Sequence, residues 1–460
     1  MKRFANLLPS MCAFMLVWIG LGFCNLALGV EDPRPLPLLE AYQLAQDHDA
    51  QLAAARAELD AGREILPQGR AGLLPTITLD ADYSRNDQDV SYNTLTSSLT
   101  STAQNQAFTS HGVSVSLRQP LFRMQNLATY RQAKAQVGVA EQTFALAEQT
   151  LILRVAQAYF DMLIAEESLA AARAQTAAAL QSLVEARRKF EVGTVTVTDV
   201  DEAQARHDLS RAEEIAVVND LEVSRQAMRK IIGQTPTRLA AARGDLPLTP
   251  LEPDDMDQWE DAATTHSPTI RIAQKTLKAA QEALAHDRGE YYPSVDLVAS
   301  YSDNATDGDD LVGEGSDTTT AVIGIQFQMP LYSGGNRSSM VREAIANVTK
   351  AKEDLREARE QVALDTRQAY LTVTSGRLQV QAFRQALISS ESSLKTTQRG
   401  FEVGIRTSLD VLNAQQQRFE AQRDLANAKY SYLNNLLKLQ AAVGVLSGTD
   451  VEDINRLLTR

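Results

Sequence analysis

A long segment of this chain occurs twice, and this repetition limits the possible folds more than any other feature of the sequence. Phe190-Glu191-Val192-Gly193 recurs as Phe401-Glu402-Val403-Gly404, an offset of 211 residues. The same offset joins Gln157-Ala158-Tyr159 to Gln368-Ala369-Tyr370, and Asp199-Val200 to Asp410-Val411. Repeated sequence indicates repeated structure. We therefore expect one unit, with one order of helices and strands, built twice.

The repeat divides the chain into five parts. They are a signal peptide at 1–29, a first repeat at 30–234, a proline-rich connector at 235–256, a second repeat at 257–444 and a C-terminal segment at 445–460. The signal peptide is predicted from a basic start, a short apolar run and a small-residue cleavage site. The alternative, a membrane anchor, requires about 20 apolar residues, and the run is shorter. Both cysteines, Cys12 and Cys24, lie in this segment, so the mature chain is predicted to contain no disulfide and no thiolate metal site.

Proline placement predicts very long helices in both copies. No proline occurs from Leu121 to Thr235 or from Leu331 to Arg460, and proline is the strongest helix breaker. We predict helices at 122–192 and 336–403, each followed by a second helix, at 197–232 and 408–443. The stretch from Phe122 to Gly193 contains 72 residues and as one helix would be roughly 108 Å long at the usual rise per residue, so the chain is predicted to form a coiled coil or a helical tube.

The ends of these helices carry recognisable caps. Gly193 and Gly404 stand where a glycine C-cap belongs. Thr196 with Asp199, and Thr407 with Asp410, have the spacing of a capping box, with aspartate in place of the usual glutamate. Each copy is therefore predicted to form a helical hairpin with a tight tip. Each copy is also expected to have one helix before its strands.

Segments at 75–91, 106–120, 293–303 and 319–330 alternate apolar and polar residues and are predicted to be strands. The pattern suits a membrane barrel with an apolar outside and suits a half-buried soluble sheet equally well. Four strands cannot close a membrane barrel, because the smallest have about 8. A membrane barrel would therefore require several chains, and three chains would supply twelve strands.

Together these features resemble the TolC family of outer-membrane channels. The sharpest element is the paired Phe-x-Val-Gly-x-x-Thr motif. The resemblance implies a mainly α fold with a β-barrel part: a homotrimer that shares a 12-stranded barrel in outer-membrane lipid, above a long α-helical barrel in the periplasm. It also implies a periplasmic adaptor protein, which would join the channel to an inner-membrane transporter of the ABC or RND type. No cofactor or metal is expected, and the net charge of −13 argues against a nucleic-acid partner.

The resemblance also implies roles for the hairpin tips. The residues expected to dock the adaptor are Phe190, Val192, Gly193, Thr196, Phe401, Val403, Gly404 and Thr407. The residues expected to form the periplasmic gate are Asp199, Phe401, Arg406, Asp410 and Asn413, with Arg406 paired to Asp199. The alternative is that Arg406 and Asp199 are solvated residues of the tips without a role in a gate. Asp410 would then only stabilise the positive end of the helix dipole.

The gate departs from the family pattern at three positions. Phe401 replaces a tyrosine, Asn413 stands where a second aspartate of an acidic ring would be, and Ser182 replaces a glutamine. With fewer polar bonds and half the acid, we predict a less tightly latched entrance and weaker block by polyvalent cations.

A passive export duct for efflux or type I secretion fits the repeat, the long helices and the tips. A trimeric coiled-coil surface protein or adhesin is the alternative, although it would not need two matched tips. An enzyme is disfavoured because no catalytic constellation is recognisable.

Overall fold

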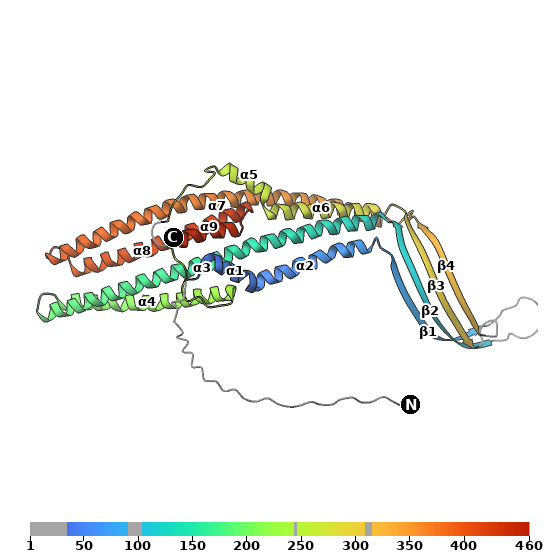
Figure 1. The fold of residues 1–460 in the computed structure, drawn as a ribbon, viewed down its shortest axis with the longest axis horizontal. Coiled ribbons are helices and arrows are strands. Elements are labelled where there is room, and N and C mark those ends of the chain that lie inside the picture. The colour runs from blue at the N-terminus through green and yellow to red at the C-terminus, as the bar shows by residue number, and fades with distance from the viewer. Residues whose placement is uncertain (1–34, 91–103, 243–245, 309–314, 460) are drawn as a thin grey trace, which may run out of the picture.

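The computed structural model describes residues 35–90, 104–242, 246–308 and 315–459, so the predicted signal peptide lies outside the described residues. This part of the chain forms an elongated, mainly helical body with a sheet at one end (Figure 1). The helices are α1 (Leu38–His48), α2 (Ala50–Ala71), α3 (Met124–Glu191), α4 (Val197–Ile232), α5 (Met256–His266), α6 (Pro268–Gly289), α7 (Asn336–Glu402), α8 (Ser408–Val443) and α9 (Gly448–Thr459). The strands are β1 (Thr76–Val90), β2 (Gln104–Phe122), β3 (Ser294–Gly308) and β4 (Ser316–Gln328).

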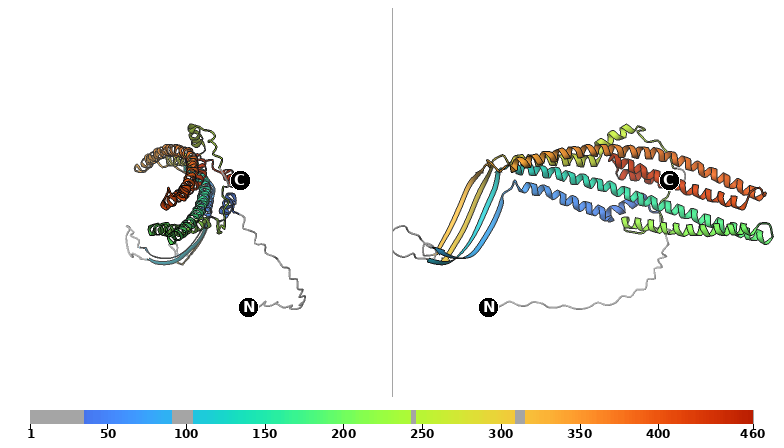
Figure 2. Two further views of the ribbon diagram at one scale, coloured as in Figure 1. Left: turned by 90° about the vertical axis from the view of Figure 1, so that its left-hand side faces the viewer. Right: turned by 180° about the vertical axis from the view of Figure 1, so that it is seen from behind.

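The two long helices, α3 and α7, set the length of the body. They contain 68 and 67 residues, or about 100 Å of helix each. Towards the tips the helices lie side by side in the order α4, α3, α8, α7 (Figure 1), and seen along the body they form an arc (Figure 2). No helix in the described ranges combines the length and the apolar character needed to cross a bilayer.

The structure corrects the prediction of a single helix before the strands of each copy, because there are two. In the first copy the break is at Asp49, whose carboxylate accepts a hydrogen bond from the Leu52 N–H at 2.8 Å and so caps α2. The same carboxylate binds Arg154 of α3 through two hydrogen bonds of 2.7 and 2.9 Å. In the second copy Pro268 begins α6, and a proline cannot continue the preceding helix.

The four strands form one antiparallel sheet in the order β1-β2-β3-β4. The register aligns apolar residues across it, with Leu79 opposite Val115 and Val115 opposite Tyr301. These side chains are exposed in the single chain, as are Ile323 and Ile325 of β4. The sheet therefore presents an apolar face that no described residue covers, and β1 and β4 are edges without a neighbour in the described part of the chain.

The strands differ from their predicted bounds mainly where they extend further. β2 runs to Phe122, which was predicted to begin the long helix, and β3 continues to Gly308. At the junction of sheet and helices, the buried Asp296 of β3 accepts hydrogen bonds from Arg123 at 2.6 and 3.0 Å. Arg118 of β2 adds an ion pair of 3.3 Å to the same carboxylate. This cluster joins β2 and β3 where the sheet meets the helices.

The main core lies midway along the body, where α1, α3, α8, α9 and the connector meet. Its centre is aromatic, with Phe160 stacked on Tyr430 at 6.0 Å between ring centroids. The repeated tyrosines hold the connector. Tyr159 donates to the backbone carbonyls of Leu36 and Ala240, and Tyr370 donates to the Asp254 carboxylate at 3.0 Å.

Candidate functional site

The two hairpin tips, at the end of the body furthest from the sheet, share one backbone geometry. Gly193 and Gly404 have φ angles of 76° and 79°, a left-handed conformation that glycine adopts without strain. In the first tip the Thr194 N–H donates to the Lys189 carbonyl at 2.9 Å, and the Gly193 N–H donates to the Phe190 carbonyl at 2.9 Å. The second tip repeats this pair of bonds with Ile405 and Gly404 as donors. Both are Schellman motifs, as the glycine positions predicted.

Capping boxes begin α4 and α8, which confirms a second local prediction. The Asp199 carboxylate accepts from the Thr196 N–H at 2.8 Å and from its hydroxyl at 2.7 Å. These bonds lower the pKa of Asp199 below its usual value. The pKa of Asp410 is also lowered, first by the Thr407 N–H, next by its hydroxyl, and less by the nearby charge of Arg406. Both carboxylates are therefore ionised at neutral pH and held in fixed positions.

A cleft of about 460 Å³ separates the two hairpins just behind their tips. Ser182, Lys189 and Asp199 line it from the first hairpin, and Phe401 and Gln415 line it from the second. The hairpins are thus not joined here by a continuous apolar core. They meet through individual side chains that cross the cleft or border it.

One of these contacts joins Phe401 to the first hairpin. The Lys189 ammonium, at the end of α3, lies 4.3 Å from the centre of the Phe401 ring, at the end of α7. This is a cation–π contact between the two hairpins. Phe190, the counterpart of Phe401, is 47 % exposed. The repeated phenylalanines therefore have different surroundings, and only Phe401 lies under a cation.

Arg406 does not pair with Asp199 within this chain. No ion pair joins the two in the part of the chain that the structure describes. The charge of Arg406 instead helps to lower the pKa of Asp410. Its backbone N–H donates to the Gly400 carbonyl at 3.2 Å, and its stem lies against Gly400. A Cβ built on Gly400 would be 2.7 Å from the Arg406 Cγ, so glycine at this position makes room for the arginine.

Asn413, the position expected to have lost an acidic group, binds an arginine from the other hairpin. Arg206 of α4 donates from Nη2 to the Asn413 Oδ1 at 3.0 Å, and from Nη1 to the Gln416 Oε1. A further ion pair joins Arg423 of α8 to Glu213 of α4 at 3.6 Å. The link between α4 and α8 is therefore polar and contains several charged groups.

The outermost residues of the tips are apolar and exposed. Val192 and Val403 are each 72 % exposed, and Ile405 is 79 % exposed. Thr196 and Thr407 cap the helices behind them. Each tip therefore presents a small apolar knob on a rigid turn.

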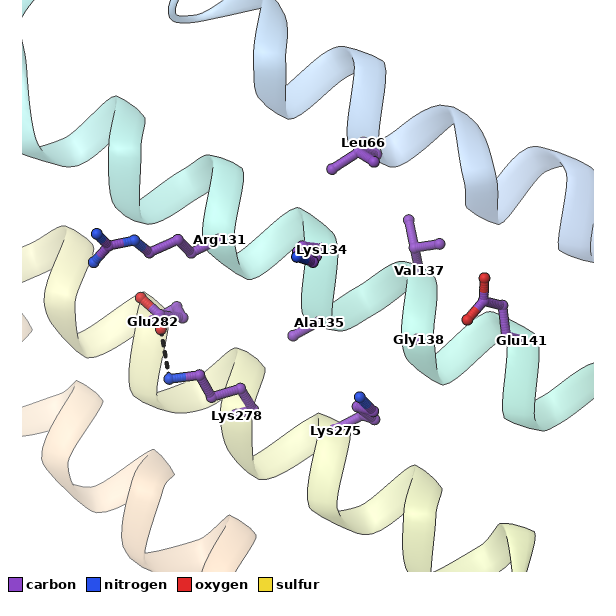
Figure 3. A pocket seen from close by; sticks show the side chains of 10 residues that line it. All are labelled: Leu66, Arg131, Lys134, Ala135, Val137, Gly138, Glu141, Lys275, Lys278 and Glu282. Carbon is purple, nitrogen blue, oxygen red and sulfur yellow. Dashed lines mark ion pairs between the residues drawn. The ribbon is translucent and has the colours of Figure 1, made fainter.

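A larger groove, of about 720 Å³, lies far from the tips between α3 and α6. Figure 3 shows its charged side chains spread along the helices rather than directed at one point. Lys278 pairs with Glu282 at 2.7 Å, while Lys134 and Lys275 lie apart from that pair (Figure 3). Side chains arranged in this way do not form a single binding centre.

Sequence reasoning missed Lys189, Arg206 and Gly400. Lys189 and Gly400 occupy the same position in the two copies, and Arg206 corresponds to Gln417. A search for differences between the copies, rather than identities, would have singled out these positions.

Comparison with known proteins agrees with this geometry. The sequence matches the family described as outer membrane efflux protein over residues 41–234 and 259–445. It is 31% identical to the outer membrane protein TolC of Vibrio cholerae over 91% of this chain and 93% of that protein. It is 29% identical to the alkaline protease secretion protein AprF of Pseudomonas aeruginosa, covering 92% of this chain and 87% of that protein.

Solved structures share the fold at lower identity. The outer membrane protein VceC of Vibrio cholerae superposes with a TM-score of 0.72 at 19% identity, over 88% of this chain and 96% of that chain. The CmeC outer membrane channel of Campylobacter jejuni gives a TM-score of 0.73 at 18% identity, over 92% of this chain and 89% of that one. The family match covers most of the chain in two segments that coincide with the sequence repeat. The chain therefore belongs to the TolC family of outer-membrane efflux channels.

Proposed function

We propose that three copies of this chain form a passive exit duct, with a shared twelve-stranded barrel in the outer membrane and a helical tube in the periplasm. The observation that carries the proposal is the sheet. It has two unpaired edges and an exposed apolar face, and it stands at the end of helices about 100 Å long. In lipid every backbone polar group requires a partner, so β4 of one chain would pair with β1 of the next.

The same closure would build the tube. Near the tips α4 lies at one edge of the arc and α7 at the other (Figure 1). In a ring, α7 of one chain would therefore face α4 of its neighbour. Arg406 follows α7 and Asp199 begins α4, so the gate pair that is absent within one chain would form between chains. A few exposed ion pairs, each worth about 0–1 kcal/mol, would hold the entrance closed and still allow it to open.

The tips would dock a periplasmic adaptor. Val192, Val403 and Ile405 offer apolar contacts, and the glycine turns behind them keep the contacts in place. The adaptor would connect the duct to an inner-membrane transporter, which would supply the energy. The relative AprF is named for alkaline protease secretion, and we propose that this chain likewise serves either secretion of a protein or efflux of small molecules.

Reconstitution tests the proposal. The mature protein, purified in detergent, should have the mass of a trimer and should form ion-conducting pores in a planar lipid bilayer. A structural surface protein would form trimers without conductance. A water-soluble monomer that forms no pores would refute the proposed duct.

A further inference from the structure

Arg206 crosses from the first hairpin to the second and carries a charge that its partners do not neutralise. It donates to the side-chain carbonyl oxygens of Asn413, at 3.0 Å, and Gln416. Both are neutral amides. No ion pair of Arg206 with a carboxylate occurs in the described ranges of the chain, and the Gln416 amide also donates to Glu420 at 2.9 Å. Three copies of the chain would therefore place three arginines without a carboxylate partner at this level.

The position of this charge follows from the helix period. Asp410, Asn413 and Gln416 succeed one another at intervals of three residues on α8, so they lie on one side of that helix. Arg206 binds the second and third members of this row. Its guanidinium is thus about one helical turn further along the body than the carboxylate that starts α8.

We infer that Arg206 determines the ion selectivity of the entrance. The inference rests on the proposed function and on the place at the gate that the sequence predicts for Asp410. Where a second aspartate would double the negative charge, this chain has a neutral amide that holds an arginine. The three Asp410 carboxylates and the three Arg206 guanidinium groups then offset each other. The entrance would discriminate weakly between K⁺ and Cl⁻, and it would bind polyvalent cations weakly.

Four channels test the inference: wild type, R206Q, N413D and the double variant R206Q/N413D. Each is reconstituted in planar bilayers. The permeability ratio of K⁺ to Cl⁻ is measured from the reversal potential in a KCl gradient, and block is measured with the trivalent cation hexaamminecobalt(III). R206Q should favour K⁺ and lower the half-blocking concentration about five- to tenfold, since three partly exposed charges each contribute about twofold. The double variant should show the strongest block.

Two comparisons separate this role from a general effect of charge or of folding. N413D alone should change block about as much as R206Q does and less than the double variant, because Arg206 would offset the new carboxylate. R211Q removes an exposed arginine of α4 that has no bond to α8 among the described residues, and it should behave as wild type. The inference is overturned if the half-blocking concentration of R206Q equals that of wild type or of R211Q. It is also overturned if the half-blocking concentration of N413D alone equals that of the double variant. A wild-type protein that forms no pores would refute the duct itself, which is a different result.

Discussion

The cation–π contact between Lys189 and Phe401 should help to hold the entrance closed. Substitution of Lys189 by methionine removes the ammonium group and keeps a long unbranched stem with good helix propensity. A contact of this kind at an accessible site contributes about 0.5–1 kcal/mol. Three contacts in a trimer would contribute about 1.5–3 kcal/mol, which corresponds to a roughly 10- to 150-fold shift in the ratio of closed to open channels.

Single-channel recording measures this shift directly as the fraction of time spent in the high-conductance state. K189M should increase that fraction, and F401L should do the same because it removes the ring but keeps an apolar side chain. K189R should behave as wild type, since arginine also binds aromatic faces. Arg188, exposed and adjacent on α3, provides the matched control R188M. The reasoning is wrong if K189M and R188M both open as rarely as wild type.

Three further predictions concern other parts of the molecule. Asp296→Ala should lower the free energy of unfolding in detergent by about 2–3 kcal/mol, below the 3–5 kcal/mol of a fully buried pair because its arginine partners are partly exposed; an unchanged melting curve by circular dichroism would contradict this. Gly400→Ala should displace the Arg406 stem at a cost of about 1–3 kcal/mol and raise the open fraction, so an open fraction equal to that of wild type would argue against the packing role. The pKa values of Asp199 and Asp410 are lowered in the folded protein, so their caps stabilise the tips fully above the ordinary carboxyl pKa of about 4, and this stability is lost as the pH falls through the lower folded values. Amide-exchange protection at the tips should therefore be constant from pH 7 to about 5 and fall only below about pH 4. A loss of protection near pH 6 would point to another group.

The features that could be predicted from sequence are those with local causes. The bounds of α4 and α8 agree with expectation because a threonine-aspartate box begins each helix and a glycine follows each one. The break at Asp49 was missed, since an aspartate within a run of helix formers is ambiguous until its partner Arg154 is known. The proline at the start of α6 was a clearer signal that was not used.

The candidate site was predictable in its backbone and not in its contacts. The motif identifies the tips, but the partners of Phe401 and Asn413 come from the other hairpin, and no local pattern specifies which side chains cross the cleft. Both partners, Lys189 and Arg206, stand where the two copies of the repeat differ. The proposed pair of Arg406 with Asp199 depends on a neighbouring chain, so it remains a prediction.

The unpaired edges of the sheet have a genetic consequence. A head-to-tail contact closes into a ring only when every member offers both of its edges. A mutation that disrupts β1 or β4 in one chain would therefore also inactivate the wild-type chains with which it assembles. In a cell that makes wild-type and mutant chains in equal amounts, only about one ring in eight would contain three wild-type chains under threefold symmetry. The mutant allele would therefore be dominant.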